Sequence, residues 1–459
     1  MTLVDSLLLS VILTLAAYAC GLALLWRRSP DPAMGISLVL VPYWTLAGAI
    51  PVLLAKRAYP LADYSYLEGR LFPIFVNDTY AATLLAYSIF VIGTLVLVAA
   101  FTRREEPKRR AGGVVAWGGL AGRFSHTLLI AMTGLLLAVK LILVVYLVRT
   151  SGSASLYEAT RVVRGGHAGV LRAYQYLNFV VAYPVAIGFT LWISFPTERR
   201  ARGHVSQIII WPAYLLMLLV LLAENALLGN RAVPLIMMAT VAAGWARWRY
   251  LPATKRARRP LRRRFVLVGL LGILALGTIG ISRGGSLVSP SAVVESLATN
   301  ALKVGNVALQ TTRSSEKLAA HMSLYAVIEH PKVQLVPLSG NSYAEYTALV
   351  GAPRDQVFTV HYVTSWWLRV GPLGVLAATL TFAAALAMLQ RLATRTPTIW
   401  TAGFCLAAAT LPAAGVPIIL LRSGPESLRA VFVELLLIPG LTLLPCFVLG
   451  SRPTSRTPR

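Results

Sequence analysis

The chain has 459 residues, of which 57% are hydrophobic and only 13% are charged. Soluble domains carry about 25% charged residues, so this composition excludes a soluble globular protein. The formal net charge of +26 would suit a nucleic-acid-binding protein, but Lys and Arg stand at the ends of apolar runs, which is the orientation signal of a membrane protein. We therefore expect the partner to be a lipid bilayer and not a nucleic acid.

Apolar runs of roughly 20 residues, the length that crosses a bilayer, recur along the chain. The first run lacks the basic start and the small-residue cleavage site of a secretory signal, so we interpret it as a retained helix. The expected fold class is an all-α polytopic transmembrane bundle of about eleven spans. The predicted helices lie at about 4–26, 34–55, 80–101, 126–148, 176–195, 207–228, 232–246, 265–281, 370–389, 398–421 and 430–449.

The distribution of basic residues predicts the orientation. Lys and Arg are densest in alternate, short loops, above all in the block Lys255–Arg264, and such loops face the cytoplasm. This places the N-terminus outside and the C-terminus inside a bacterial inner membrane. Residues 1–281 then hold helices one to eight, 282–369 form a long extracytoplasmic loop, and 370–459 hold the last helices and a cytoplasmic tail. The long loop is expected to be partly helical, because 291–312 has helical apolar spacing.

Basic side chains on the outer side run against this charge rule and need another explanation. Arginine forks bind phosphate oxygens in two-point geometry, and an outer-leaflet lipid pyrophosphate is a natural ligand for a cluster of them. For each arginine taken singly, snorkelling to headgroups or pairing with a nearby acid is the favoured explanation, whereas for the cluster as a whole an anion site is favoured. The candidate substrate-binding residues of this kind are Arg161, Arg164, His167, Arg172, Arg283, Arg354, Arg422 and Arg429.

Ionisable residues also lie within apolar runs, namely Lys140, Glu224 and Glu434. An unpaired charge in hydrocarbon is expensive, so each should face the bundle interior or a polar cavity. Structural pairing is the favoured interpretation, with Arg231 as the expected partner of Glu224 and Arg429 as that of Glu434. Proton or substrate handling is the alternative for all of them.

The segment from His361 to Gly374 combines a histidine, aromatic residues and a helix start. A neutral imidazole at the mouth of a helix can take a proton from a hydroxyl, and Tyr362 and Trp366 can stack on sugars. Taken alone, an interfacial histidine is more often structural than catalytic. The outer histidines share no ligand spacing and no cysteine joins them, so we expect no metal site and no cofactor.

The same segment resembles the motif of the O-antigen ligase and polymerase superfamily, in which a histidine and a short polar stretch precede a helix and a glycine pair spaced like Gly371 and Gly374. Upstream, Gly229–Leu235 resembles the family's arginine turn. The order of arginine turn, spans, long outer loop, histidine and final spans is also similar, over roughly 207–449. The chain departs from the pattern at Tyr362, where the family often has Asn.

The resemblance implies a metal-independent glycosyltransferase that polymerises undecaprenyl-pyrophosphate-linked oligosaccharide repeat units on the extracytoplasmic face, for an O-antigen, capsule or exopolysaccharide. Arg231 would hold the pyrophosphate, His361 would orient or deprotonate the acceptor hydroxyl, and a chain-length regulator would be a candidate partner. The first alternative is an O-antigen ligase, with the same chemistry on a lipid A-core acceptor.

Two other functions are weaker alternatives. A metal-dependent transferase that uses polyprenyl-monophosphate sugars usually has an acidic pair in the first outer loop, and here the acids of that loop are dispersed. A secondary transporter, which belongs to another functional class, tends to show repeated halves, and the single long outer loop breaks such symmetry.

Overall fold

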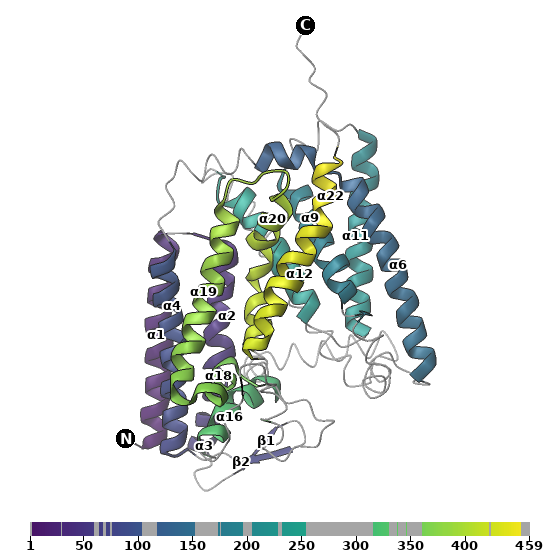
Figure 1. Cartoon of the computed structure of the whole chain (residues 1–459). Helices are drawn as coiled ribbons and strands as arrows, with labels where there is room; N and C mark the ends of the chain where they lie inside the picture. Colours follow the sequence, from purple (N-terminus) through teal and green to yellow (C-terminus); the bar gives the residue numbers. More distant parts are fainter. Residues whose placement is uncertain are drawn as a thin grey trace. The chain divides into compact units, whose positions relative to one another are not determined.

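The computed structural model describes residues 2–28, 30–58, 64–67, 70–73, 76–102, 117–151, 173–174, 176–195, 204–227, 232–253, 315–329, 337, 346, 360–421 and 424–450. These residues are mostly helical, with one short β-hairpin (Figure 1). The chain divides into two compact units, and each is described by itself.

Apolar helices long enough to cross a membrane confirm a multi-pass membrane protein of the all-helical class. Within the described ranges there are six of them: Leu3–Arg28, Asp78–Phe101, His126–Thr150, Ile208–Asn225, Tyr362–Thr394 and Pro425–Val448. Shorter apolar helices cover Pro32–Thr45, Asn178–Ser194 and Ala402–Ala413. The predicted helix at 265–281 and the helical stretch expected at 291–312 lie outside the described residues.

The first unit comprises Met1–Arg104, Asn300–Met388 and Val416–Val431. In this unit α1 packs along α4, and α16 packs against α2, α4 and α18 (Figure 1). Its elements are α1 (Leu3–Arg28), α2 (Pro32–Thr45), α3 (Ala49–Ala58), β1 (Tyr64–Leu67), β2 (Arg70–Pro73), α4 (Asp78–Phe101), α16 (Ser315–Glu329), α18 (Tyr362–Val370), η3 (Gly371–Leu373), most of α19 (Gly374–Thr394), most of α21 (Gly415–Leu420) and η5 (Pro425–Ser427). The antiparallel hairpin pairs Tyr64 with Pro73 and Leu67 with Arg70.

Glycines lie at two breaks between helices of the first unit, and one of these breaks falls within a helix that hydropathy predicts as continuous. The predicted helix at 34–55 is split, because α2 ends at Thr45 and α3 begins at Ala49. Gly48 lies in the gap, and a Cβ added there would fall 2.8 Å from the Cβ of His321, so the glycine lets α16 approach closely. Gly371 has a φ of 62°, a left-handed conformation that favours glycine, and it separates α18 from α19.

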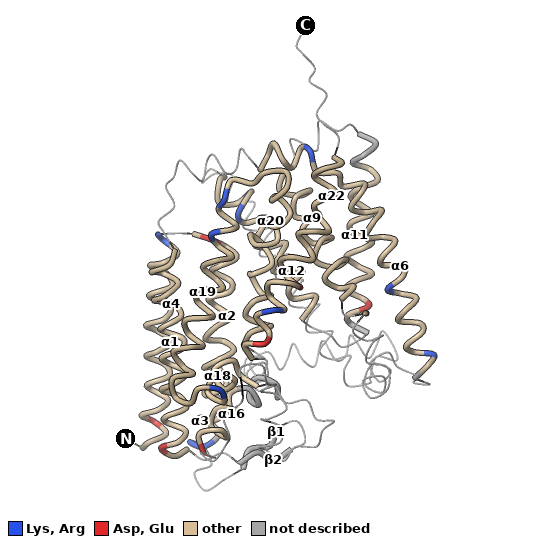
Figure 2. Tube along the Cα trace, in the orientation of Figure 1, with Lys and Arg blue, Asp and Glu red and all other residues tan. Residues whose placement is uncertain are grey.

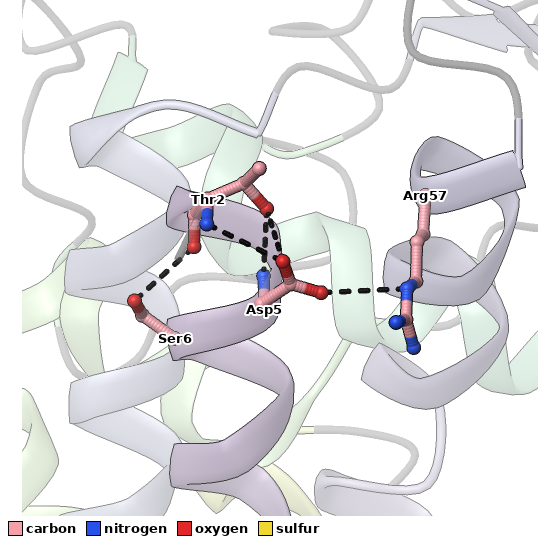
Figure 3. A network of polar contacts seen from close by, with 4 residues as sticks. All are labelled: Thr2, Asp5, Ser6 and Arg57. Atoms are coloured by element: carbon pink, nitrogen blue, oxygen red, sulfur yellow. Dashed lines mark hydrogen bonds and ion pairs between the residues drawn. The ribbon is translucent and has the colours of Figure 1, made fainter.

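Charged residues lie toward the ends of α1 and α4 and leave the middles of these helices apolar (Figure 2). At the start of α1, the Asp5 carboxylate accepts hydrogen bonds from the backbone N–H and the hydroxyl of Thr2 and pairs with Arg57 of α3 at 3.4 Å, while Ser6 donates to the Thr2 carbonyl (Figure 3). Arg57 is well exposed, so this pair adds little stability.

The second unit comprises Glu105–Thr299, Leu389–Gly415 and Phe432–Arg459. Here α12 packs on α9 and α20 packs on α22. A Cβ on Gly403 would fall 2.4 Å from the carbonyl oxygen of Gly440, so small residues permit the close approach of α20 and α22. The elements are α6 (His126–Ser151), η1 (Asn178–Ala182), α9 (Tyr183–Ser194), α11 (His204–Leu227), α12 (Ala232–Trp245), η2 (Ala246–Tyr250), α20 (Ala402–Thr410), η4 (Leu411–Ala413), most of η6 (Ala430–Leu437) and α22 (Ile438–Val448).

Candidate functional site

Buried polar side chains gather in the first unit where α2 ends, α18 begins and α16 packs against both. The large majority of polar groups buried in proteins are hydrogen-bonded to one another or to the backbone. We call this group the histidine cluster; its members are Thr45, His321, Ser323, His361, Thr364, Ser365 and Arg369.

His361 caps the N-terminus of α18. Its backbone is extended, its ring Nδ1 accepts the Val363 N–H at 3.2 Å, and its own N–H donates to the Ser323 hydroxyl at 3.2 Å. Because Nδ1 accepts, the neutral ring carries its proton on Nε2. Nε2 lies 3.2 Å from the hydroxyl oxygen of Thr45 and donates to it.

His321 of α16 lies beside His361 and has the opposite tautomer. Its Nδ1 lies 3.1 Å from the Thr45 carbonyl oxygen, which can only accept, so Nδ1 carries the proton. Its Nε2 lies 2.9 Å from the Tyr80 hydroxyl, which therefore donates. Thr45 thus serves both rings, with its carbonyl bound to one and its hydroxyl to the other.

Both histidines are neutral at neutral pH. Burial, together with the smaller effect of the neighbouring His321, lowers the pKa of His361 to about 3. Burial lowers the pKa of His321 to about 4, against the opposing effect of the Thr45 carbonyl. Two neutral rings whose nitrogens are all hydrogen-bonded fix the geometry of the surrounding helices, but they hold no positive charge for an anion.

Arg369 supplies the fixed charge of the cluster. Its Nη1 donates to the Ser365 carbonyl and hydroxyl, both at 2.9 Å, and its Nη2 donates to Glu426 at 2.9 Å. The Arg369 side chain is 0% exposed whereas that of Glu426 is 38% exposed. A Cβ on Gly424 would collide with the Ser365 hydroxyl and with Glu426, so this glycine lets the 424–427 turn close on α18. The buried guanidinium is thus paired with a carboxylate that is partly exposed.

Four of the predicted site residues are described. His361 is fully buried in the cluster, Trp366 is half-buried and Arg429 is exposed. Tyr362 was expected to contact sugar, but its ring is buried against Phe382 and its hydroxyl is 2.9 Å from that of Thr381, so it belongs to the core in this conformation. The other predicted residues lie outside the described part of the chain: Arg161, Arg164, His167, Arg172, Arg231, Arg283, Arg354 and Arg422.

A second polar cluster lies in the second unit and contains an ion pair. Lys140 of α6 donates to Glu224 of α11 at 2.6 Å and to the side-chain oxygen of Asn178 at 2.7 Å. Tyr174 donates its hydroxyl to the other oxygen of Glu224, and burial followed by the Glu224 charge raises the pKa of this phenol, which keeps it a donor. The pairing expected for Glu224 therefore exists, with Lys140 as the partner; Arg231, the partner expected from the sequence, is not among the described residues.

Within the described ranges, no group of three or more His, Cys, Asp and Glu side chains could hold a metal ion. Compared with known proteins, the chain matches no family model, no curated protein and no solved structure. The family resemblance of the His361 and Arg231 segments stays a prediction from their motifs.

Of the seven members of the histidine cluster, sequence reasoning selected only His361 as a site residue. It missed Thr45, His321, Ser323, Thr364, Ser365 and Arg369, and also the Glu426 partner of Arg369. A threonine in the middle of an apolar run, followed three positions later by a glycine, is the local pattern that marks Thr45 and Gly48. His321 has no local pattern, because its partners come from α2 and α4.

Proposed function

We propose that this chain is a membrane glycosyltransferase that polymerises undecaprenyl-pyrophosphate-linked oligosaccharide repeat units on the extracytoplasmic face of the bacterial inner membrane. The observation that carries the proposal is the histidine cluster, in which the motif histidine starts α18 among buried hydroxyls and a fixed arginine. Buried polar and ionisable groups inside a membrane domain are costly and are typical of functional sites.

In the proposed reaction, an acceptor hydroxyl oxygen attacks the anomeric carbon of the lipid-linked sugar. The bond from that carbon to the pyrophosphate oxygen breaks, undecaprenyl pyrophosphate leaves with its negative charge, and the acceptor proton passes to water. Fixed guanidinium groups stabilise such a leaving group. We assign this role to Arg231 with the other outer arginines, assign the orientation of the acceptor side to His361, and assign sugar contact to Trp366.

The proposal includes eleven spans, with the N-terminus outside and the C-terminus in the cytoplasm. In the first unit Tyr325 of α16 packs with Val11, in the first half of α1, while Arg27 and Arg28 lie at the far end of α1. An outside N-terminus therefore puts the histidine cluster on the extracytoplasmic side and these two arginines on the cytoplasmic side, in agreement with the charge rule. A reporter fused at Glu316 should report an extracytoplasmic location. A cytoplasmic location would contradict both this topology and the proposed catalysis on the extracytoplasmic face.

The test is polymer formation by the purified protein in nanodiscs supplied with lipid-linked repeat units. A ladder of lengthening glycans on gels is expected, and it should persist in EDTA. Loss in EDTA with rescue by magnesium or manganese would favour the metal-dependent transferase. A single transfer to lipid A-core without a ladder would favour the ligase, and movement of unchanged substrate across proteoliposomes would favour a transporter.

A further inference from the structure

We infer that His361 is a positioning residue that caps α18 rather than the base that removes the acceptor proton, and that Thr45 and His321 hold it in that role. The inference rests on the proposed function, because it assigns the division of labour within the same site. It depends on which atoms of each imidazole are already engaged.

A general base needs an open nitrogen lone pair directed at the hydroxyl that it deprotonates. The Nδ1 lone pair of His361 accepts the Val363 N–H at 3.2 Å, which satisfies one of the amides that every helix start leaves without an intrahelical partner. Nε2 carries the proton and donates it to the Thr45 hydroxyl oxygen at 3.2 Å. Neither nitrogen is open to a substrate hydroxyl.

The other protonation states of His361 disrupt this arrangement. A proton on Nδ1, in the second neutral tautomer or in the imidazolium, would face the Val363 N–H and leave two donors opposed in a buried site. A buried donor without an acceptor loses its full solvation. The ring is 0% exposed and is enclosed by the rings of Tyr87 and Phe90, at centroid distances of 4.8 and 5.9 Å, so water cannot compensate.

Thr45 and His321 fix the acceptor that His361 needs. The Thr45 hydroxyl receives the His361 proton, while the Thr45 carbonyl receives the Nδ1–H of His321 at 3.1 Å. His321 is anchored in turn by the Tyr80 hydroxyl of α4, and Tyr87 donates to its carbonyl, both at 2.9 Å. The end of α2 is thereby hydrogen-bonded to α16, which keeps the hydroxyl of Thr45 directed at His361.

This hydrogen-bond network fixes the position of α18. The helix begins at the His361 cap, and two turns later its Arg369 guanidinium reaches the partly exposed Glu426. A capped, fixed α18 therefore presents the charged pair at a constant position, whereas a base would have to lose its hydrogen bonds in every catalytic cycle.

His361→Asn and His361→Ala separate the two roles. Asparagine is among the best N-cap residues, and its amide can accept the Val363 N–H and donate toward Thr45, but it has no titratable group. If His361 is a positioning residue, alanine should lower the polymerisation rate about tenfold and asparagine should restore it to within about threefold of wild type. If His361 is the base, both variants should lose activity by a factor on the order of 10² or more. A folded His361→Asn protein as inactive as His361→Ala would overturn the inference.

A readout independent of activity uses the ring nitrogens. In ¹⁵N-histidine-labelled protein, His361 should show a protonated Nε2 and His321 a protonated Nδ1. Thr45→Val, which is nearly isosteric but offers no acceptor, should change the His361 spectrum and lower the rate, while Thr45→Ser should preserve both. A protonated Nδ1 on His361 would refute the cap assignment even if the protein polymerises glycans. Wild-type protein that makes no polymer would instead refute the proposed function and leave the tautomer result to decide the cap.

Discussion

The ion pair between Lys140 and Glu224 predicts a large and coupled effect on stability. Both side chains are almost fully buried, at 0% and 3% exposure, and the Lys140 nitrogen lies 2.6 Å from the carboxylate. Exposed ion pairs contribute about 0–1 kcal/mol, but here each charge lacks water as an alternative partner. We propose a mutant cycle of Lys140→Met, Glu224→Met and the double variant, because methionine is unbranched like both side chains and has no charge.

Each single substitution should lower the free energy of unfolding by about 3–5 kcal/mol, because it leaves one buried charge without its counter-charge. Without Lys140, Glu224 retains only the Tyr174 hydroxyl among its observed partners, and without Glu224, Lys140 retains Asn178. The double variant removes both charges and leaves only the neutral groups of Tyr174 and Asn178 unsatisfied, at a cost of about 1–3 kcal/mol. The double variant should therefore lose far less free energy of unfolding than about 6–10 kcal/mol, which is the sum expected if the two single substitutions acted independently.

The assay is reversible unfolding in mixed detergent micelles, titrated with SDS and followed by tryptophan fluorescence. Leu141→Met, one residue along α6 and 37% exposed, is the matched control and should leave the midpoint almost unchanged. A double variant that loses as much as the two single variants together would show that the charges are not coupled, and the interpretation of this cluster as a structural pair would fail.

The remaining predictions concern the first unit. Acidification from about pH 6.5 to 4 should lower the free energy of unfolding, because folding lowers the pKa of His321 to about 4 and that of His361 to about 3, from 6.5, so the unfolded state binds more protons in this range. Stability should be fully present above pH 6.5, and replacing both histidines by asparagine should flatten the profile; an equally steep profile in that variant would contradict the assignment. Glu426→Gln should destabilise the protein by about 1 kcal/mol, a value reduced by solvent screening, because it removes the counter-charge of the buried Arg369. Asp5→Asn, in the exposed pair with Arg57, is the control; an equal effect of both changes would show that burial of the arginine does not matter.

Hydropathy predicted where the long helices lie, because the length of an apolar run and the charges at its ends can both be read from a short stretch of sequence. The run predicted at 4–26 is α1, Leu3–Arg28, and that at 80–101 is α4, Asp78–Phe101. The interruptions were not predicted. The run at 398–421 contains α20, η4 and α21. Pro412 lies in η4 and Gly415 begins α21, and these residues change the backbone conformation without changing the mean hydropathy of the run.

The candidate site was predictable only in part. His361 was found from its motif, but Thr45 lies 316 positions away along the chain, and no periodicity connects two residues at that distance. For Glu224, the sequence argument chose Arg231 because it is close in sequence, whereas Lys140 is 84 positions away on another helix. Opposite charges within apolar runs of different helices were the better indicator, because hydrocarbon offers a lone charge no other partner.

The two polar clusters differ in how they avoid an uncompensated charge, and the difference bears on function. The charge of the buried Lys140 is neutralised by the buried carboxylate of Glu224 within the second unit. The two imidazoles of the histidine cluster are neutral, each with one donor and one acceptor in fixed directions, so they help to join α2, α16 and α18 without adding a buried charge. Arg369 is the described cation of that cluster, and its counter-ion is partly exposed. The described charge of this cluster therefore lies at the Glu426 end of α18, where Arg369 donates its Nη2 to one carboxylate oxygen, and not at the imidazoles.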